Sequence, residues 1–304
     1  MTNLTAFQEK IKGLFPEKNI LFNESMAKHT SFRIGGPAEV FLLPKSVEEL
    51  SCVLKGTNAL GIVPRILGAG TNVLAPDEGL PGLTICLKDA LDTMEELPDG
   101  RIRVAAGVTM TRAAVFAASR NLGGMEFAHG IPGTVGGGVY MNAGAYGGEI
   151  KDICSSVDVL SSNGVLTTLT AEEMNFSYRH SRLEDEGGIV VSAVFQLSAK
   201  PEDEVRRCMQ ELMSKRKASQ PLDMPSAGSA FKRPVGGYAA ALIDQAGLKG
   251  FQVGGAAISQ KHAGFAVNMG DATAADVKAL LEQVSDRVYQ QSGIRLEPEV
   301  RIWE

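Results

Sequence analysis

The chain has 304 residues, a mass of 32.2 kDa and a formal net charge of −5 at pH 7. That length suits two or three domains, and the acidic balance gives nucleic acid or an anionic membrane no general reason to bind. Hydrophobic residues make up 44 % and charged residues 21 %, which excludes wholesale disorder. No apolar run reaches the roughly 18 residues of a membrane span. Residues 1–15 include Glu9 and lack a continuous apolar core, so we expect no secretory signal and a cytoplasmic protein.

Two residue types stand out in the composition. Glycine occurs 34 times, while aromatic residues are only 6 % of the chain. So many glycines in a folded chain without repeats indicate tight turns or close backbone approaches. The four cysteines, Cys52, Cys86, Cys154 and Cys208, have neither zinc-ligand nor redox-motif spacing. We therefore expect four reduced thiols and no metal site.

The residues up to about 200 read as short strands and turns with a few helices. The capping-box sequence that starts at Ser46 predicts a helix to about Leu60. Asn163-Gly164 predicts a hairpin turn between strands at 157–160 and 165–169. Strands around glycine turns are expected at 66–74 and 84–87, and a further strand at 101–105. The strand expected at 189–197 is apolar enough to be buried on both faces, and a further helix is expected at 109–121.

The composition changes near Pro201. Apolar residues at helical spacing predict helices at 202–217 and 271–292, separated by a polar loop at 219–225. Residues 294–303 alternate as a strand would, with Leu296 and Val300 on one face and Glu299 on the other, and Pro298 as a local departure. The pattern is α+β, with a larger part at 1–200 and a smaller part at 201–304.

Two glycine-rich segments beside predicted strands suggest a ligand. Residues 130–148 hold eight glycines in 19 positions, and a second such segment spans 67–72. Neither has the phosphate-loop ending or the usual dinucleotide fingerprint. Successive N–H groups in such segments can form a concavity for an anion. A single glycine turn is more often structural, but two beside strands favour a dinucleotide-type cofactor.

Six motifs in order resemble those of the UDP-N-acetylenolpyruvoylglucosamine reductase (MurB) family. They are HTSFRIGGPAE (29–39), LGAGTNVL (67–74), GIPGTVGGGVYMNAGAYG (130–147), FSYRHS (176–181), GSAFKRP (228–234) and LEPEVR (296–301). The resemblance spans about residue 25 to the C-terminus, and the length is similar to that of the shorter of the family's two forms. It implies an FAD-binding domain of the vanillyl-alcohol-oxidase (PCMH) type at 1–200, with two α+β subdomains and a core at about 30–198. A smaller α+β substrate-binding domain at 201–304 would follow, its last strand returning to the flavin domain.

The implied activity is that of an oxidoreductase in peptidoglycan precursor synthesis, and so in cell-wall biogenesis, cell shape and cell division. NADPH would reduce a non-covalently bound FAD, which would pass the hydride to the β-carbon of the enolpyruvyl group of the UDP-sugar. The α-carbon would then carry negative charge delocalised into its carboxylate, so the protein must stabilise that charge and supply a proton. No nucleic acid, membrane or obligate protein partner is implied.

The resemblance assigns three catalytic residues. Ser229 matches the proton donor, with Lys232 as a candidate to assist it; the alternative is a turn serine after Gly228. Arg179 matches an arginine whose planar fork holds the carboxylate; without the motif it would be a solvated arginine. Glu299 matches the catalytic glutamate, either orienting Arg179 or acting as a carboxylic acid; the strand pattern alone would turn it to solvent.

The remaining implied contacts fall into two sets. The cofactor set comprises Arg33, Gly35, Gly36, Gly68, Ala69, Gly70, Thr71, Asn72, Gly130, Ile131, Pro132, Gly133, Thr134, Gly136, Gly137, Gly138, Asn142, Gly144 and Ile189. The substrate set comprises Tyr146, Tyr178, Lys232, Lys261, His262 and Asn268. A diphosphate substrate also requires a local basic patch, which we expect among Lys215, Arg216, Lys217, Lys232 and Arg233. An isolated histidine such as His262 is more often structural.

Two other functions fit parts of the pattern. A flavin-dependent oxidase or dehydrogenase of hydroxy acids would keep the glycine segments but would not need Ser229, Arg179 and Glu299 together. A regulatory protein that binds a nucleotide or an anion would need only the glycine segments.

Overall fold

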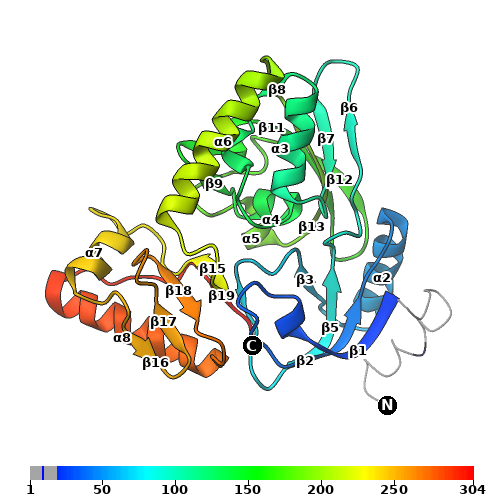
Figure 1. Ribbon diagram of the computed structural model, residues 1–304. Helices are drawn as coiled ribbons and strands as arrows, with labels where there is room; N and C mark the ends of the chain where they lie inside the picture. Colours follow the sequence, from blue (N-terminus) through cyan, green and yellow to red (C-terminus); the bar gives the residue numbers. More distant parts are fainter. Residues whose placement is uncertain (1–8, 10–18) are drawn as a thin grey trace. The chain divides into compact units, whose positions relative to one another are not determined.

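The computed structural model describes residue 9 and residues 19–304 (Figure 1). Residues 1–15, for which we expected no secretory signal, lie outside the described residues except for Glu9. The chain forms two compact units. Among the described residues, the first contains 19–22, 40–69 and 82–214, and the second contains 23–39, 70–81 and 215–304. Within the part of the chain that the structure describes, no helix is both long enough and apolar enough to cross a membrane.

An antiparallel five-stranded sheet forms the centre of the first unit. Its strand order is β12 (Leu166–Thr170), β11 (Cys154–Leu160), β13 (Ile189–Phe195), β7 (Ile102–Ala105) and β6 (Met94–Glu96). The predicted hairpin is present, with Leu160 paired to Leu166. Helices α3 (Met110–Ser119) and α4 (Val135–Tyr140) belong to this unit, and α4 packs on β13 and on α3 (Figure 1). Helix α6 (Glu202–Ser219) belongs to it up to Ser214. Six of the seven β13 residues are buried, so the predicted buried strand is confirmed.

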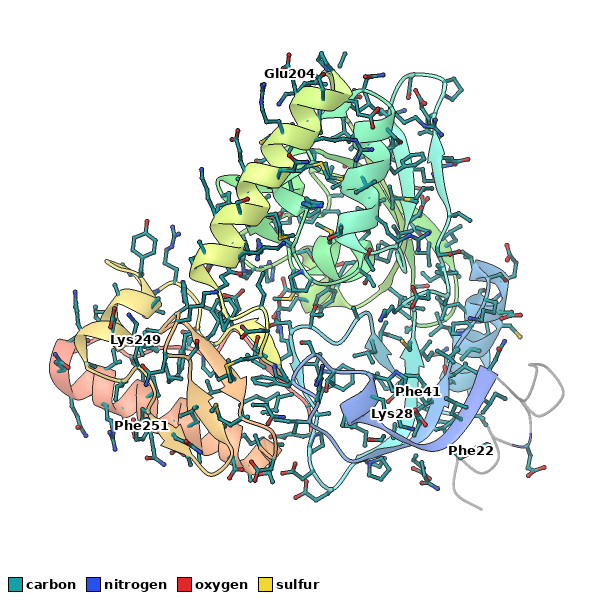
Figure 2. All side chains as sticks on the ribbon, in the orientation of Figure 1. Phe22, Lys28, Phe41, Glu204, Lys249 and Phe251 are labelled. Atoms are coloured by element: carbon teal, nitrogen blue, oxygen red, sulfur yellow. The ribbon has the colours of Figure 1, made fainter. Side chains whose placement is uncertain are left out.

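A second sheet has the strand order β1 (Ile20–Ser25), β2 (Pro37–Leu42), β5 (Leu80–Cys86) and β3 (Arg65–Leu67), with β3 parallel to β5. The helix predicted after Ser46 is α2 (Val47–Ala59), and the Ser46 hydroxyl accepts a hydrogen bond from the Glu49 N–H. The Glu49 carboxylate accepts from the N–H of Lys45 at 2.7 Å. These two bonds show that the N-terminal cap of α2 was predictable from the sequence. Phe41 of β2, which is labelled in Figure 2, is completely buried.

Short elements connect these sheets. They are η2 (Met26–Lys28), β4 (Val73–Leu74), β8 (Leu122–Gly123), η3 (Glu126–Ala128), β9 (Gly144–Ala145), β10 (Gly148–Glu149), η4 (Ile150–Asp152), α5 (Arg182–Glu186) and β14 (Ser198–Ala199). The pair β9–β10 and the pair β8–β14 are both antiparallel.

The C-terminal part of the second unit contains an antiparallel sheet and two helices. The sheet order is β15 (Ser226–Ser229), β18 (Phe265–Asn268), β17 (Ala256–Ile258) and β16 (Gln252–Val253), and the helices are α7 (Ala239–Gln245) and α8 (Ala274–Ser292). The predicted 271–292 helix starts three residues late because Thr273 caps it: the Thr273 hydroxyl accepts from the Asp276 N–H at 3.0 Å. Phe251, just before β16, lies under the Arg287 guanidinium of α8, 4.0 Å from ring centroid to Cζ (Figure 2).

The core of the second unit combines segments that are far apart in the sequence. Phe32, Ile34 and Leu74 share one buried cluster with α7, α8 and the sheet. The carboxylate of Asp77 accepts hydrogen bonds from the N–H groups of Ala274 and Ala275, in the first turn of α8. The residues at 23–39 and 70–81 are therefore integral to this unit.

The predicted strand at 294–303 is wrong over most of its length. Only β19 (Arg301–Ile302) is a strand, parallel to β4. Before it, Pro298 forms a single antiparallel bridge with Phe231, in which the flanking residues make the hydrogen bonds and the missing proline N–H is not needed. Leu296 and Val300 are buried as the alternation required, but Ile302 is 37 % exposed. The segment thus changes partner at Pro298, and no single strand continues through it.

Candidate active site

Arg179 lies in a tight turn of the first unit. Ser177 and His180 bond to each other through both of their N–H groups, which leaves Tyr178 and Arg179 at the tip. The backbone of Arg179 is left-handed, with φ of +56°. Its guanidinium donates to the carbonyl oxygen of Gly144 at 3.5 Å and stands 5.1 Å from the centroid of the Tyr178 ring. The turn therefore carries two of the predicted site residues side by side.

Two side chains fasten this turn to the rest of the unit. The Asn142 amide donates to the Ser177 carbonyl at 2.9 Å, and the Ser181 hydroxyl donates to the Tyr140 carbonyl at 2.7 Å. Both side chains belong to completely buried residues. Asn142 also donates to the Glu149 carboxylate and accepts from the Lys151 N–H. The structure thus commits the Asn142 side chain to protein groups, whereas the resemblance implied a cofactor contact.

Three of the predicted site residues, none of them Gly, Asn or Asp, have a left-handed backbone conformation. Among the described residues other than glycine, eight have positive φ, and five of them are Asn or Asp, which tolerate that conformation. The other three are Arg33 (φ +57°), Tyr146 (φ +54°) and Arg179. All three are in the sequence-predicted set. Such backbone strain is concentrated at functional sites, so this observation supports them independently of any motif.

Ser229 ends β15 in the second unit. The pairing of β15 with β18 is irregular between Ser226 and Ser229, and Gly228 has φ of +77° with no atom within 4 Å of where a Cβ would stand. Ser229 itself is exposed, while Ala230 after it is completely buried. An irregularity of this kind redirects a side chain. The structure therefore leaves the Ser229 side chain exposed at the end of β15.

Glu299 lies beside this segment. Its N–H donates to the carbonyl of Ala230 at 2.9 Å, and its carbonyl accepts from the Asn72 amide at 3.0 Å. Asn72 also accepts, through its own carbonyl, from the N–H of Arg301. The second unit thus brings Ser229 and Glu299 together, and Asn72, a predicted cofactor contact, fixes the backbone of Glu299. Arg179 belongs to the first unit.

The lysines of the substrate set have protein partners. Lys232 donates its N–H to the Glu297 carbonyl at 2.9 Å, and its ammonium lies 3.4 Å from the Glu297 carboxylate. The Lys261 ammonium donates to the carbonyl of Lys217, within the expected basic patch. Lys232 remains about half exposed, so its charge is available beside the Ser229 segment.

His262 and Asn268 have structural surroundings. The His262 Nδ1 accepts from the N–H of Gly264 at 3.1 Å, and burial, aided by the charge of Lys249, lowers the pKa of His262. Its ring contacts Phe265 edge-on. The Asn268 amide donates to the Phe32 carbonyl, and its oxygen accepts from two N–H groups at the turn that follows β18. Both side chains are engaged with protein groups, as the cautious interpretation of His262 expected.

Packing accounts for most glycines of the cofactor set. A Cβ on any of seven of them would stand within 3 Å of protein atoms: Gly35, Gly36, Gly68, Gly70, Gly136, Gly138 and Gly144. Gly70 faces the carbonyl oxygen of His29 at 2.0 Å from that Cβ position, and Gly68 faces the Thr134 hydroxyl at 2.6 Å. Glycine density in these motifs therefore has a structural cause in addition to any ligand.

This packing gives a stability prediction. Gly70→Ala should lower the free energy of unfolding by about 3 kcal/mol or more, because the left-handed alanine costs about 1–2 kcal/mol and the overlap with His29 adds to it. Gly61 has nearly the same φ, +66° against +62°, but nothing within 4 Å, so Gly61→Ala should cost only about 1 kcal/mol. Urea unfolding of both variants measures the difference. Equal losses would show that the close approach to His29 is not rigid.

In two glycine-rich segments of the first unit, at 68–69 and 130–138, four of the described backbone N–H groups remain for a ligand. In the 130–138 segment, the N–H groups of residues 130, 131 and 135–138 donate to protein acceptors. The N–H groups of Gly133 and Thr134, and those of Gly68 and Ala69, donate to no acceptor within the described range 19–304. Gly68 and Thr134 adjoin each other. Adjacent unused donors of this kind suit a phosphate group, so the residues present fit the pyrophosphate of FAD.

The other predicted contacts are more scattered. Ile189 begins β13 and is 7 % exposed, whereas Tyr146 and Tyr178 are about half exposed. Arg33 projects from a turn between the buried residues Phe32 and Ile34.

Within residue 9 and residues 19–304, no group of three or more His, Cys, Asp or Glu side chains could hold a metal ion. The four cysteines are free thiols, and burial raises the pKa of Cys154 to about 12.

Sequence reasoning missed two positions. Ser181 and Glu149 support the Arg179 turn, yet neither was singled out. Ser181 stands inside a recognised motif, FSYRHS, and follows the arginine by two residues. Nothing in the sequence pattern marks Glu149, since its partner Asn142 is identifiable only in the folded chain.

Comparisons with known proteins identify the family. A family model described as an FAD binding domain matches residues 38–170, and one described as the C-terminal domain of UDP-N-acetylenolpyruvoylglucosamine reductase matches residues 220–303. The UDP-N-acetylenolpyruvoylglucosamine reductase from Agathobacter rectalis is 44 % identical to this chain, and the match covers 98 % of both chains. The reductase from Latilactobacillus sakei is also 44 % identical, and the match covers 99 % of this chain and 98 % of the relative.

Solved structures agree. The crystal structure of the Thermus caldophilus reductase matches with a TM-score of 0.79 and 36 % identity, covering 94 % of this chain and 98 % of that one. The expected class, an α+β FAD-binding domain of the vanillyl-alcohol-oxidase type with a smaller α+β domain, is thereby confirmed. The chain belongs to the UDP-N-acetylenolpyruvoylglucosamine reductase family of FAD-dependent oxidoreductases.

Proposed function

We propose that this protein reduces UDP-N-acetylenolpyruvoylglucosamine to UDP-N-acetylmuramate, with NADPH as the electron donor and FAD as the bound cofactor. Family membership supports the substrate. The observation that carries the assignment is the Ser229 segment, an exposed hydroxyl beside an unfilled glycine position with the backbone of Glu299 bonded to the next residue. NADPH would place the reaction in the cytoplasm, and none of the proposed steps requires a second protein.

The residues of the chain divide the work. FAD held by the N–H groups of Gly68, Ala69, Gly133 and Thr134 would supply hydride transfer from NADPH to the β-carbon of the enolpyruvyl group. Arg179 holds the substrate carboxylate with its planar fork and stabilises the charge that develops there. Ser229 donates a proton from its hydroxyl to the α-carbon, which completes the addition of two hydrogens across the double bond. Glu299 either orients Arg179 or, as a carboxylic acid, stabilises the same charge.

Both units contribute to this proposal. The unused N–H groups at Gly68, Ala69, Gly133 and Thr134, all in the first unit, bind the FAD pyrophosphate. The remaining flavin contacts fall within residues 30–198, of which 30–39 and 70–81 belong to the second unit, and the substrate contacts come mainly from residues 201–304. Tyr146 and Tyr178, which are exposed aromatic side chains, contribute to substrate binding from the first unit.

An absorbance experiment tests this function. The purified, FAD-loaded protein is reduced anaerobically with NADPH and then mixed with UDP-N-acetylenolpyruvoylglucosamine. We expect the visible flavin band to bleach with NADPH and to return with the sugar nucleotide. Bleaching without return would assign the protein to another flavin-dependent reaction, such as hydroxy-acid oxidation. No flavin band at all would leave only a regulatory nucleotide or anion site.

A further inference from the structure

We propose that Asn142 is a positioning residue that holds the left-handed turn on which Arg179 sits. The proposal deepens the proposed function, because it rests on the role given there to Arg179. It also reassigns Asn142, which the sequence resemblance placed among the cofactor contacts.

The hydrogen bonds of Asn142 use both of its amide N–H groups within the protein. A side-chain amide offers two N–H donors and a carbonyl oxygen that accepts. One donor goes to the Ser177 carbonyl at 2.9 Å and the other to the Glu149 carboxylate at 2.7 Å, while the carbonyl accepts from the Lys151 N–H at 2.9 Å. The side chain is completely buried. One residue therefore joins the turn at 177–180 to the 149–151 segment and to its own segment after α4.

The backbone conformation and the neighbours of position 142 explain why it is an asparagine. Asn142 has φ of +43°, and asparagine is one of the few side chains that tolerate the left-handed region. Aspartate also tolerates it, but its carboxylate would face the Glu149 carboxylate across 2.7 Å without a proton between them. Glycine would accept the backbone conformation and remove all three hydrogen bonds.

The turn needs this restraint because its tip is strained. Arg179 has φ of +56°, which costs an ordinary L-residue about 1–2 kcal/mol. Besides the mutual bonds of Ser177 and His180, the Asn142 amide and the Ser181 hydroxyl tie the turn to the segment around α4. Without the amide, the turn relaxes, and the Arg179 guanidinium leaves its position near the Gly144 carbonyl.

Limited proteolysis tests the positioning independently of catalysis. Trypsin cleaves after arginine, so the rate of cleavage at Arg179, followed by mass spectrometry, reports how well the turn is held. Asn142→Gly should speed this cleavage by about tenfold or more, since local opening becomes easier. Asn121→Gly is the matched control: Asn121 is also left-handed, with φ of +56°, and its side chain also accepts a backbone N–H, that of Glu202. An unchanged rate in Asn142→Gly, or an equal rise in Asn121→Gly, would overturn the proposal.

Rapid-mixing kinetics then test the link to Arg179. For Asn142→Gly we expect reduction of FAD by NADPH within about twofold of wild type and re-oxidation by the sugar nucleotide slowed about 10- to 100-fold, the usual cost of losing an orienting partner. In an Arg179→Ala background, Asn142→Gly should slow re-oxidation no further. Loss of FAD binding would make Asn142 a cofactor contact, and additive losses would separate it from Arg179; either result overturns the proposal. If the wild-type flavin is not re-oxidised at all, the proposed function fails, while the proteolysis still decides whether Asn142 holds the turn.

Discussion

Ser229→Ala should slow re-oxidation of the reduced flavin by UDP-N-acetylenolpyruvoylglucosamine by about 100- to 10,000-fold, the range for losing a general acid. Reduction of the flavin by NADPH should be unchanged, because that step needs no proton at the α-carbon. Ser229 is exposed, so the free energy of unfolding should change by no more than about 0.5 kcal/mol. Anaerobic stopped-flow absorbance measures the two half-reactions separately.

The control for this variant is Ser226→Ala, at the other end of β15. It removes a hydroxyl from the same strand without touching the irregularity at Gly228, and both half-reactions should keep their wild-type rates. A loss of similar size in both half-reactions of Ser229→Ala would sink the assignment of Ser229 as the proton donor.

Arg179→Ala and Arg179→Gly should each slow re-oxidation by about 100- to 1,000-fold, as the loss of a charge-stabilising donor does. Their stabilities should differ. At φ of +56° an alanine costs about 1–2 kcal/mol more than a glycine, so the glycine variant should be the more stable by about 1 kcal/mol in urea unfolding.

The control position is His180, whose φ is not positive. At this position the alanine variant should have a higher free energy of unfolding than the glycine variant, the reverse of the order at Arg179. A glycine variant at position 179 that is less stable than the alanine variant would show that the left-handed turn does not exist in solution.

Local chemistry was readable from the sequence wherever a few neighbouring residues decide the structure. Ser46 caps α2 with its own hydroxyl, and Asn163-Gly164 makes a hairpin turn. Apolar composition alone identified β13 as a buried strand. For the cap and the turn, the partners lie within a few residues, so the sequence contains the whole interaction; for β13, a run of apolar residues sufficed although its partner strands are far away in the sequence.

The sequence was least informative where partners are far away. The Asn268 amide bonds to the Phe32 carbonyl, 236 positions away, and that of Asn72 to the Glu299 carbonyl, 227 positions away. A polar residue in a family motif can bind a ligand or a remote backbone, and only the folded chain distinguishes the two. The last strand failed similarly, since its alternation is interrupted where Pro298 exchanges one partner strand for another.

The glycine-rich motifs also could not be interpreted from the sequence alone. Their density pointed to a cofactor, yet Gly36, Gly70 and Gly136 are required by neighbouring protein atoms. The family match, and the unused N–H groups near Gly133, support flavin binding better than glycine frequency does.

The composition of the second unit determines the order in which it can assemble on the ribosome. Phe32, Ile34 and Leu74 are translated early but are buried among residues from 227 onward, and Leu74 also pairs with Ile302. N-terminal segments of a nascent chain usually fold first, but these must wait until residues up to about 302 have emerged. Their apolar side chains stay uncovered until then, so a chain that stops before residue 227 is prone to aggregate, and a chaperone that shields residues 23–39 and 70–81 has its greatest effect before the rest of this unit is made.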